Sequence, residues 1–175
     1  MPRLKKFIGF WIVLIMFGAL IPGTFYQVSV WLDRVLGFQP FLVEPNNAFA
    51  SAFAMIIGVF WVTWSYSYLH FVGMGSPVEA FGKALYPTQK LVVTGPYAYT
   101  RNPMMFGLLF VLLAIALYAG SISGLILIPI LALFVVAYLR RFEEPGLVRR
   151  FGEDYTGYRK AVPMLIPKLR PSAVP

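Results

Sequence analysis

One uncharged stretch constrains the fold of this chain more than any other feature, because no Asp, Glu, Lys or Arg occurs between Asn102 and Leu139. As a single helix this stretch would be about 57 Å long, which allows barely two crossings of a bilayer core about 30 Å thick. A helix break is expected at Tyr118-Ala119-Gly120-Ser121, where glycine follows the last residues of the first apolar half. The sequence therefore predicts a tight helical hairpin.

Two further apolar runs precede this hairpin, Phe7 to Leu32 and Asn46 to Val78, and neither carries a charge. Each is longer than the roughly 20 residues that a transmembrane helix needs. A basic start before an apolar run is also typical of a cleaved signal peptide, but no small-x-small cleavage site follows here, which favours a first transmembrane helix. Aromatic residues crowd the end of the second run and indicate an aromatic belt at the membrane interface.

The composition supports a membrane protein, since 59% of the residues are hydrophobic and 13% are charged, whereas a soluble domain usually has about 25% charged residues. We predict an all-α, polytopic membrane protein with about four transmembrane helices, a C-terminal helical hairpin and a cytoplasmic C-terminal segment. We expect a single integral membrane domain, residues 1–175. The predicted transmembrane helices span about residues 7–28, 47–71, 103–118 and 121–140.

The basic residues predict the orientation of these helices. With four crossings, every Lys and Arg except Arg34 falls on one side of the membrane. The positive-inside rule then places both termini in the cytoplasm, at the inner membrane if the source is bacterial. We attribute the net charge of +8 to an anionic lipid leaflet and not to a nucleic-acid partner. The chain has no Cys and a single His, which excludes disulfides, thiol catalysis and metal sites built from Cys or clustered His.

A polar stretch from Lys90 to Gly107 leads into the hairpin. Gly95-Pro96 predicts a turn, and Asn102-Pro103 predicts a helix start, with Asn102 as the N-cap and Pro103 at the first helical position. Arg101 then lies beside the positive end of the new helix, which is unfavourable unless an anion binds there too. The stretch therefore suggests a site for a carboxylate or a phosphate. The alternative is an interfacial Arg that reaches to lipid phosphates beside an ordinary helix cap.

The hairpin makes Arg140–Glu144 the neighbour of this helix start. A pocket between them would combine cations for a carboxylate or phosphate with Glu143 and Glu144 for an amine, a sulfonium or ribose hydroxyls. The alternative is a structural ion-pair cluster that closes the hairpin. Charged groups at a membrane boundary are nevertheless candidates for function.

Two segments of the chain carry a family resemblance. Leu91–Gly107 resembles the first signature of the isoprenylcysteine carboxyl methyltransferase and phospholipid methyltransferase superfamily, and Glu143-Glu144-x-x-Leu147-x-x-x-Phe151-Gly152-x-x-Tyr155-x-x-Tyr158 resembles the second. The resemblance covers roughly residues 73 to 167, in the right order and around a matching hairpin. It implies an integral membrane enzyme that transfers a methyl group from S-adenosylmethionine.

The resemblance also implies a site. It assigns cofactor binding to segments 75–102 and 140–170 on the cytoplasmic face, and the catalytic roles to Arg101, Glu144 and Arg141, with Arg140 or Arg141 facing the substrate. The cofactor-binding residues that it implies are Leu91, Val92, Thr94, Gly95, Tyr97, Arg101, Asn102, Pro103, Glu143 and Glu144. It requires no metal. One departure is that Asn102 replaces the His of the familiar eukaryotic pattern and Met105 replaces an aromatic residue; Asn forms hydrogen bonds but does not titrate, so it is not a general base.

Two other functions are compatible with the residues. A membrane reductase that uses a nicotinamide cofactor would share an Arg-His-Pro hairpin motif with the sterol reductases, although those chains are much longer. A non-catalytic protein would bind anionic lipid through its basic tail, which contains Arg149, Arg150, Arg159 and Lys160. If the chain is a methyltransferase, its partners are the membrane and a lipid or lipophilic small molecule. The candidate methyl acceptors are a lipid amine, a lipophilic carboxylate, a small thiol and a quinone-like phenol. The sequence leaves the oligomeric state open.

Overall fold

The computed structural model describes residues 11–12, 14–74, 79–80, 83–84 and 88–172. The basic start at residues 1–6, the first residues of the helix predicted from residue 7, and parts of the predicted cofactor segment 75–102 lie outside the described residues. The helical elements in chain order are η1 (Met16–Leu20), α2 (Ile21–Leu36), α3 (Asn46–Phe71), η2 (Gly95–Ala98), α4 (Pro103–Ala119), α5 (Ile122–Tyr138), η3 (Leu139–Glu143) and α6 (Glu144–Ala161). Two short antiparallel strands, β1 (Glu79–Ala80) and β2 (Lys83–Ala84), pair between α3 and η2.

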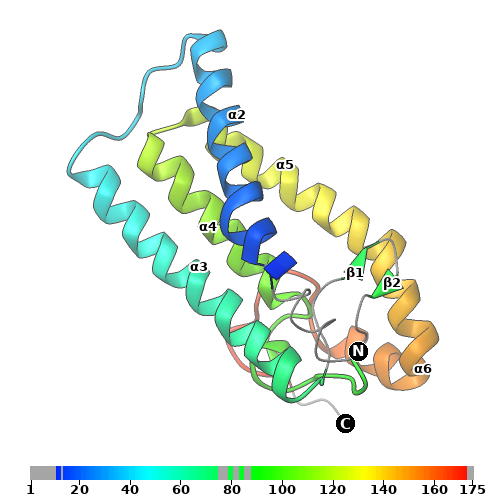
Figure 1. The fold of residues 1–175 in the computed structure, drawn as a ribbon. Coiled ribbons are helices and arrows are strands. Elements are labelled where there is room, and N and C mark those ends of the chain that lie inside the picture. The colour runs from blue at the N-terminus through cyan, green and yellow to red at the C-terminus, as the bar shows by residue number, and fades with distance from the viewer. Residues whose placement is uncertain (1–10, 13, 75–78, 81–82, 85–87, 173–175) are drawn as a thin grey trace.

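The long helices form one bundle, in which α4 packs against α2, α3 and α5 (Figure 1). The contact between α3 and α4 is close because a glycine on each helix faces the other. A Cβ atom on Gly107 would lie 2.8 Å from the carbonyl oxygen of Gly58, and one on Gly58 would lie 2.9 Å from that of Gly107. Small residues that allow two backbones to approach in this way are typical of helix pairs in membranes.

The predicted hairpin is present. Helix α4 ends at Ala119, Gly120 adopts a left-handed conformation (φ 61°), and the Ser121 side chain caps α5 by accepting a hydrogen bond from Gly124 N at 2.9 Å. Glycine is required at position 120 for a second reason, because a Cβ there would lie 2.6 Å from the carbonyl oxygen of Leu42. The break between the two apolar halves is therefore where the sequence predicts it.

The first helix is longer than the sequence predicts. It continues to Leu36 and ends at Gly37 instead of near residue 28, so Asp33 lies in the helix and not in a loop. The carboxylate explains this difference, because Asp33 Oδ1 accepts a hydrogen bond at 2.9 Å from the backbone N–H of Ser123, in the first turn of α5. A carboxylate is stabilised at a helix N-terminus, so the charge is satisfied at the end of the bundle.

The second half of the hairpin also continues past its predicted end near residue 140. Helix α5 leads through the π-helical turn η3 directly into α6, with no loop between them. Helix α6 lies at the opposite end of the bundle from the turn between α4 and α5 (Figure 1). Pro145 lies in the first turn of α6 and does not interrupt this continuous helix.

Among the described residues, two helices are long and apolar enough to cross a membrane by length and composition: Asn46–Phe71 and the continuous helix Ile122–Ala161. Their apolar windows are only 17% buried within the protein. On α3, for example, Phe49, Phe53 and Ile56 are each about 70% exposed, which is typical of a surface that faces lipid. The helical prediction is thus confirmed, whereas the four crossings and the cytoplasmic location of both termini stay predictions.

Candidate functional site

A cavity of about 130 Å³ lies where the start of α4 meets η3 and α6. It has a mixed lining, with charged groups from the end of each half of the hairpin and apolar groups from three further segments. The lining residues are Leu69, Thr88, Leu91, Val92, Tyr97, Arg101, Asn102, Pro103, Met104, Met105, Leu139, Glu143, Glu144, Leu147, Arg150, Phe151, Tyr155 and Tyr158. The two polar segments singled out in the sequence therefore share one cavity.

Arg101 is the central cation of this cavity, and its side chain is 9% exposed. Its Nη1 forms an ion pair with Glu144 Oε1 and lies 3.4 Å from the hydroxyl of Tyr155. Its Nε donates a hydrogen bond at 3.0 Å to the carbonyl of Val162. The guanidinium is thus held in one orientation from two sides, by α6 and by the chain that follows α6.

Glu144 supplies the opposite charge from the first residue of α6. Its side chain is 10% exposed, and its two oxygens face different cations: Oε1 faces Arg101, and Oε2 lies 3.6 Å from Nη1 of Arg159. A carboxylate at a helix N-terminus is also favoured by the helix dipole. A buried charge requires such partners, because an unpaired one is strongly destabilising.

Residues 162–172 form a C-terminal strap that lies against the segment before α4. Backbone hydrogen bonds of 2.9–3.0 Å join this strap to residues 98–101. The Thr100 hydroxyl donates to the strap carbonyl of Leu165 at 3.0 Å, and Asn102 Nδ2 donates to that of Met164 at 2.9 Å. The strap contains Pro163, Pro167 and Pro171 and has no helix or strand. It therefore fixes the backbone on both sides of Arg101.

This arrangement corrects one part of the sequence prediction. Asn102 occupies the N-cap position of α4 and Pro103 the first helical position, as predicted, but the Asn102 side chain makes no capping hydrogen bond to the helix. Its amide binds the strap instead. The side chain thus acts in holding the C-terminal strap, and the helix start relies on the proline.

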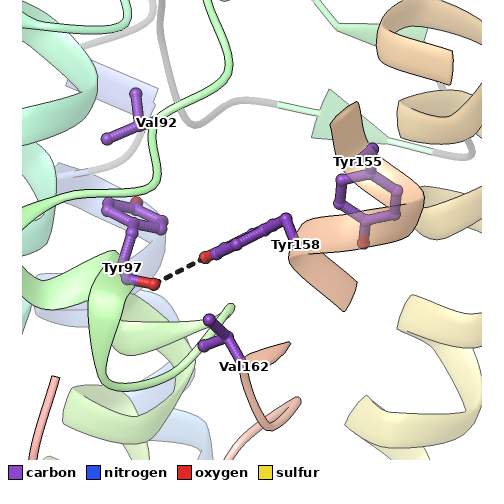
Figure 2. Close-up of a cluster of buried hydrophobic side chains, with 5 residues drawn as sticks. All are labelled: Val92, Tyr97, Tyr155, Tyr158 and Val162. Atoms are coloured by element: carbon purple, nitrogen blue, oxygen red, sulfur yellow. Dashed lines mark hydrogen bonds between the residues drawn. The ribbon is translucent and has the colours of Figure 1, made fainter. Parts of the chain in front are cut away.

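Three tyrosines line one wall of the cavity, and one of them, Tyr155, also contacts Arg101. Tyr97, Tyr155 and Tyr158 cluster with Val92 and Val162, and the hydroxyl of Tyr158 donates a buried hydrogen bond of 2.8 Å to the carbonyl of Tyr97 (Figure 2). Burial raises the pKa of Tyr155 to about 12, and the negative charge of Glu144 adds to this effect. Burial also raises the pKa of Tyr97 and of Tyr158. All three phenols are therefore neutral at physiological pH.

Aromatic residues of α3 brace this end of α4. The ring of Trp61 lies 5.1 Å from that of Phe106 and 6.3 Å from that of Tyr99, in both cases edge to face. Trp64 lies 6.0 Å from Tyr99. These rings, which the sequence suggests as an interfacial belt, thus pack directly on the segment that carries Arg101.

Most residues of the implied site line the cavity: Leu91, Val92, Tyr97, Arg101, Asn102, Pro103, Glu143 and Glu144. Three do not appear in its described lining, namely Thr94, Gly95 and Arg141. Arg141 is exposed, and its guanidinium lies 5.8 Å from the ring of Phe142. The predicted turn at Gly95-Pro96 is present as η2, where the close Tyr68 ring leaves no space for a side chain on Gly95.

Several residues of α6 contribute to the cavity although the motif resemblance implies no individual role for them. Leu147, Phe151, Tyr155 and Tyr158 line the cavity, and Arg159 contacts Glu144. The sequence does indicate that Leu147, Phe151, Tyr155 and Tyr158 lie near Glu144, because their spacing from Glu144 follows one face of a helix. The chain bends at Gly152 (φ 56°, ψ −125°), so helical spacing alone is an imperfect guide beyond that residue.

The donor set of the cavity suits a zwitterionic ligand with an apolar part. Arg101 can bind a carboxylate, the two glutamates can bind an ammonium group or hydroxyls, and the apolar and aromatic residues can hold a flat ring. The cavity is smaller than the roughly 300–1,000 Å³ of sites that enclose drug-sized ligands. A ligand of nucleoside size therefore either extends beyond the mouth of the cavity or displaces part of its lining.

Comparisons with known proteins indicate the protein family that this chain resembles. The model of the family "Phospholipid methyltransferase" matches residues 47–154. Methanethiol S-methyltransferase 2 of Bradyrhizobium diazoefficiens is 32% identical over 127 residues, an alignment that covers 66% of this chain and 46% of the relative. The chain thus spans less than half the length of this relative. No solved structure matches the chain significantly.

Proposed function

We propose, because this chain belongs to the phospholipid methyltransferase family, that it transfers a methyl group from S-adenosylmethionine to a small lipophilic acceptor at the cytoplasmic face of a membrane. Family membership confirms the resemblance to this superfamily, and the matched residues 47–154 include Leu91–Gly107 and the first part of the second motif. One observation carries the proposal: Arg101 and Glu144 are 43 positions apart in sequence but meet in one cavity. Opposite charges beside apolar walls are what a charged nucleoside with an amino-acid tail requires.

The residues fit this cofactor by their chemistry. Arg101 would hold its carboxylate, Glu143 its ammonium group, and the apolar side chains of Leu91, Val92 and Phe151 its purine, with Glu144 beside Arg101 at the amino-acid end. When bound, S-adenosylmethionine supplies an electrophilic methyl group on a sulfonium. Because catalysis of a displacement depends largely on positioning, the main task of these residues is to fix the ligand against an acceptor.

Proton transfer limits the kind of acceptor. The titratable side chains among the described lining residues are Arg, Glu and Tyr, and the phenols are neutral near pH 7. The single histidine, His70, stacks on Tyr66 at 6.0 Å between ring centroids and is not among those lining residues. An acceptor that carries a proton must therefore lose it to water or to one of the two glutamates. The name of the relative makes a small thiol the first acceptor to test.

The proposal is tested first by binding. We expect the protein, purified into lipid nanodiscs, to bind S-adenosylhomocysteine in calorimetry, and Arg101→Gln to weaken binding by about tenfold or more, since a hydrogen-bonded charge is lost. Arg101→Lys should have a smaller effect, because it keeps the charge but not the planar fork. Arg149→Gln is the matched control, since Arg149 is exposed on α6 and outside the described lining.

A transfer assay then tests the acceptor. Nanodiscs are incubated with methyl-labelled S-adenosylmethionine and either ethanethiol or a lipid extract, and labelled products are identified by mass spectrometry. Absence of both binding and transfer in the wild-type protein would refute the proposal. Label in lipid but not in the thioether would retain the methyltransferase and reject the thiol.

A further inference from the structure

The ion pair between Arg101 and Glu144 lies among the lining residues of the cavity that the proposed function needs open. Arg101 donates from Nε to Val162 and from Nη1 toward Glu144 and Tyr155, while its Nη2 donates no hydrogen bond to any residue that the structure describes. A ligand carboxylate that binds a guanidinium with two parallel hydrogen bonds uses two neighbouring nitrogens. Because Nε is occupied by the strap, the two nitrogens left for the ligand are Nη1 and Nη2. Nη1 carries two N–H groups, which point toward Glu144 and Tyr155, so a carboxylate that binds Nη1 and Nη2 takes the place of one of these two contacts.

Glu144 has a second cation to which it can turn. Its other oxygen, Oε2, lies 3.6 Å from Nη1 of Arg159, in the last turn of α6. The side chain of Arg159 is 45% exposed, so it can move toward the carboxylate with little loss of packing. Without Arg159, a Glu144 displaced from Arg101 would remain a buried carboxylate with no cation among its described contacts, which is strongly unfavourable.

We propose that Glu144 exchanges between Arg101 and Arg159, and that Arg159 is a positioning residue which frees Arg101 for the carboxylate of the methyl donor. This inference rests on the proposed function, because it assigns that carboxylate to Arg101. Before binding, Glu144 neutralises Arg101 and keeps the cavity small. With the ligand bound, Glu144 pairs with Arg159, and no buried charge is left without a partner.

The exchange makes a prediction that depends on the ligand. S-adenosylhomocysteine carries the carboxylate, whereas 5′-methylthioadenosine has the same nucleoside and a thioether but no amino-acid group. Arg159→Gln should weaken S-adenosylhomocysteine about fivefold, the size expected of a half-exposed ion pair, and should leave the affinity for methylthioadenosine unchanged. Arg159→Lys should restore most of the loss, because it keeps a cation beside Glu144.

The experiment measures both ligands by calorimetry on full-length protein in nanodiscs, with thermal unfolding of each variant as a check on folding. Arg149→Gln, with the same change of charge on the same helix, is the control and should alter neither affinity. If Arg159→Gln weakens both ligands equally, Arg159 only supports the fold and the exchange is wrong. If it weakens neither while the wild-type protein binds S-adenosylhomocysteine, the exchange is also wrong but the proposed function stands. If the wild-type protein does not bind S-adenosylhomocysteine, both fail.

Discussion

The buried ion pair offers the sharpest test of the site without any ligand. Arg101→Met removes the cation and leaves Glu144, whose side chain is 10% exposed, with Arg159 as its remaining described cation. Breaking a buried pair costs about 3–5 kcal/mol, and a half-exposed ion pair contributes at most about 1 kcal/mol. We therefore expect Arg101→Met to lower the free energy of unfolding by about 3 kcal/mol. Glu144→Leu should cost a similar amount, because it leaves Arg101 buried with hydrogen bonds but no anion.

The double variant separates this interpretation from simple loss of packing. With both charges replaced by apolar groups no buried charge is left unpaired, so Arg101→Met with Glu144→Leu should cost only about 1–2 kcal/mol, less than either single change. For a chain of this size 1 kcal/mol shifts the midpoint of thermal unfolding by roughly 2–4 °C. In detergent, the unfolding midpoint of each single variant should thus lie about 6–12 °C below that of the wild-type protein. The midpoint of the double variant should lie closer to the wild-type value.

A surface control completes this cycle. Arg141→Met removes an exposed guanidinium that lies over Phe142, and the free energy of unfolding should change by no more than about 0.5 kcal/mol. Additive losses in the double variant, or an Arg101→Met variant as stable as the Arg141→Met control, would show that the two charges do not depend on each other and would refute the reasoning.

Three further predictions concern other parts of the structure. Gly107→Ala should lower the free energy of unfolding by about 1–3 kcal/mol, because the new Cβ would lie 2.8 Å from the carbonyl oxygen of Gly58. Gly157→Ala is the control and should raise the free energy of unfolding by about 0.5–1 kcal/mol, because nothing lies within 4 Å of its Cβ. Equal effects of the two variants in thermal unfolding would contradict the close contact between Gly107 and Gly58. The pKa of Tyr155 is raised from 10.0 to about 12 in the folded protein, so its contribution to stability is complete below pH 10 and is lost as the pH rises toward 12. Midpoints of thermal unfolding measured from pH 8 to 12 should therefore fall less steeply for Tyr155→Phe than for the wild-type protein. Asn102→Ala removes a hydrogen bond to the C-terminal strap and should cost about 1 kcal/mol, with faster proteolysis of residues 162–172 as the readout; an unchanged cleavage rate would show that this bond does not hold the strap.

Several features of the fold follow from local sequence patterns. The uncharged runs predict helices, Gly120 marks the hairpin break, and Asn102-Pro103 marks the start of α4. Where a charge lies within a helix the local pattern misleads: Asp33 suggests a loop, but its carboxylate binds the N-terminus of α5 and the helix continues to Leu36. The sequence contains no sign of that contact, because its partner is a backbone N–H group, which every residue except proline has.

The same distinction applies to the candidate site. Taken alone, the sequence determined that cations and carboxylates gather at one end of a helical hairpin, because the apolar length between them permits only that arrangement. Only the tertiary structure decided that Arg101 pairs with Glu144, that Asn102 binds the C-terminal strap instead of capping its helix, and that Arg159 is within reach of the pair. The physical reason is that helical spacing defines which residues share a face, whereas the rotation of each helix and the path of the strap are set by packing between segments distant in sequence.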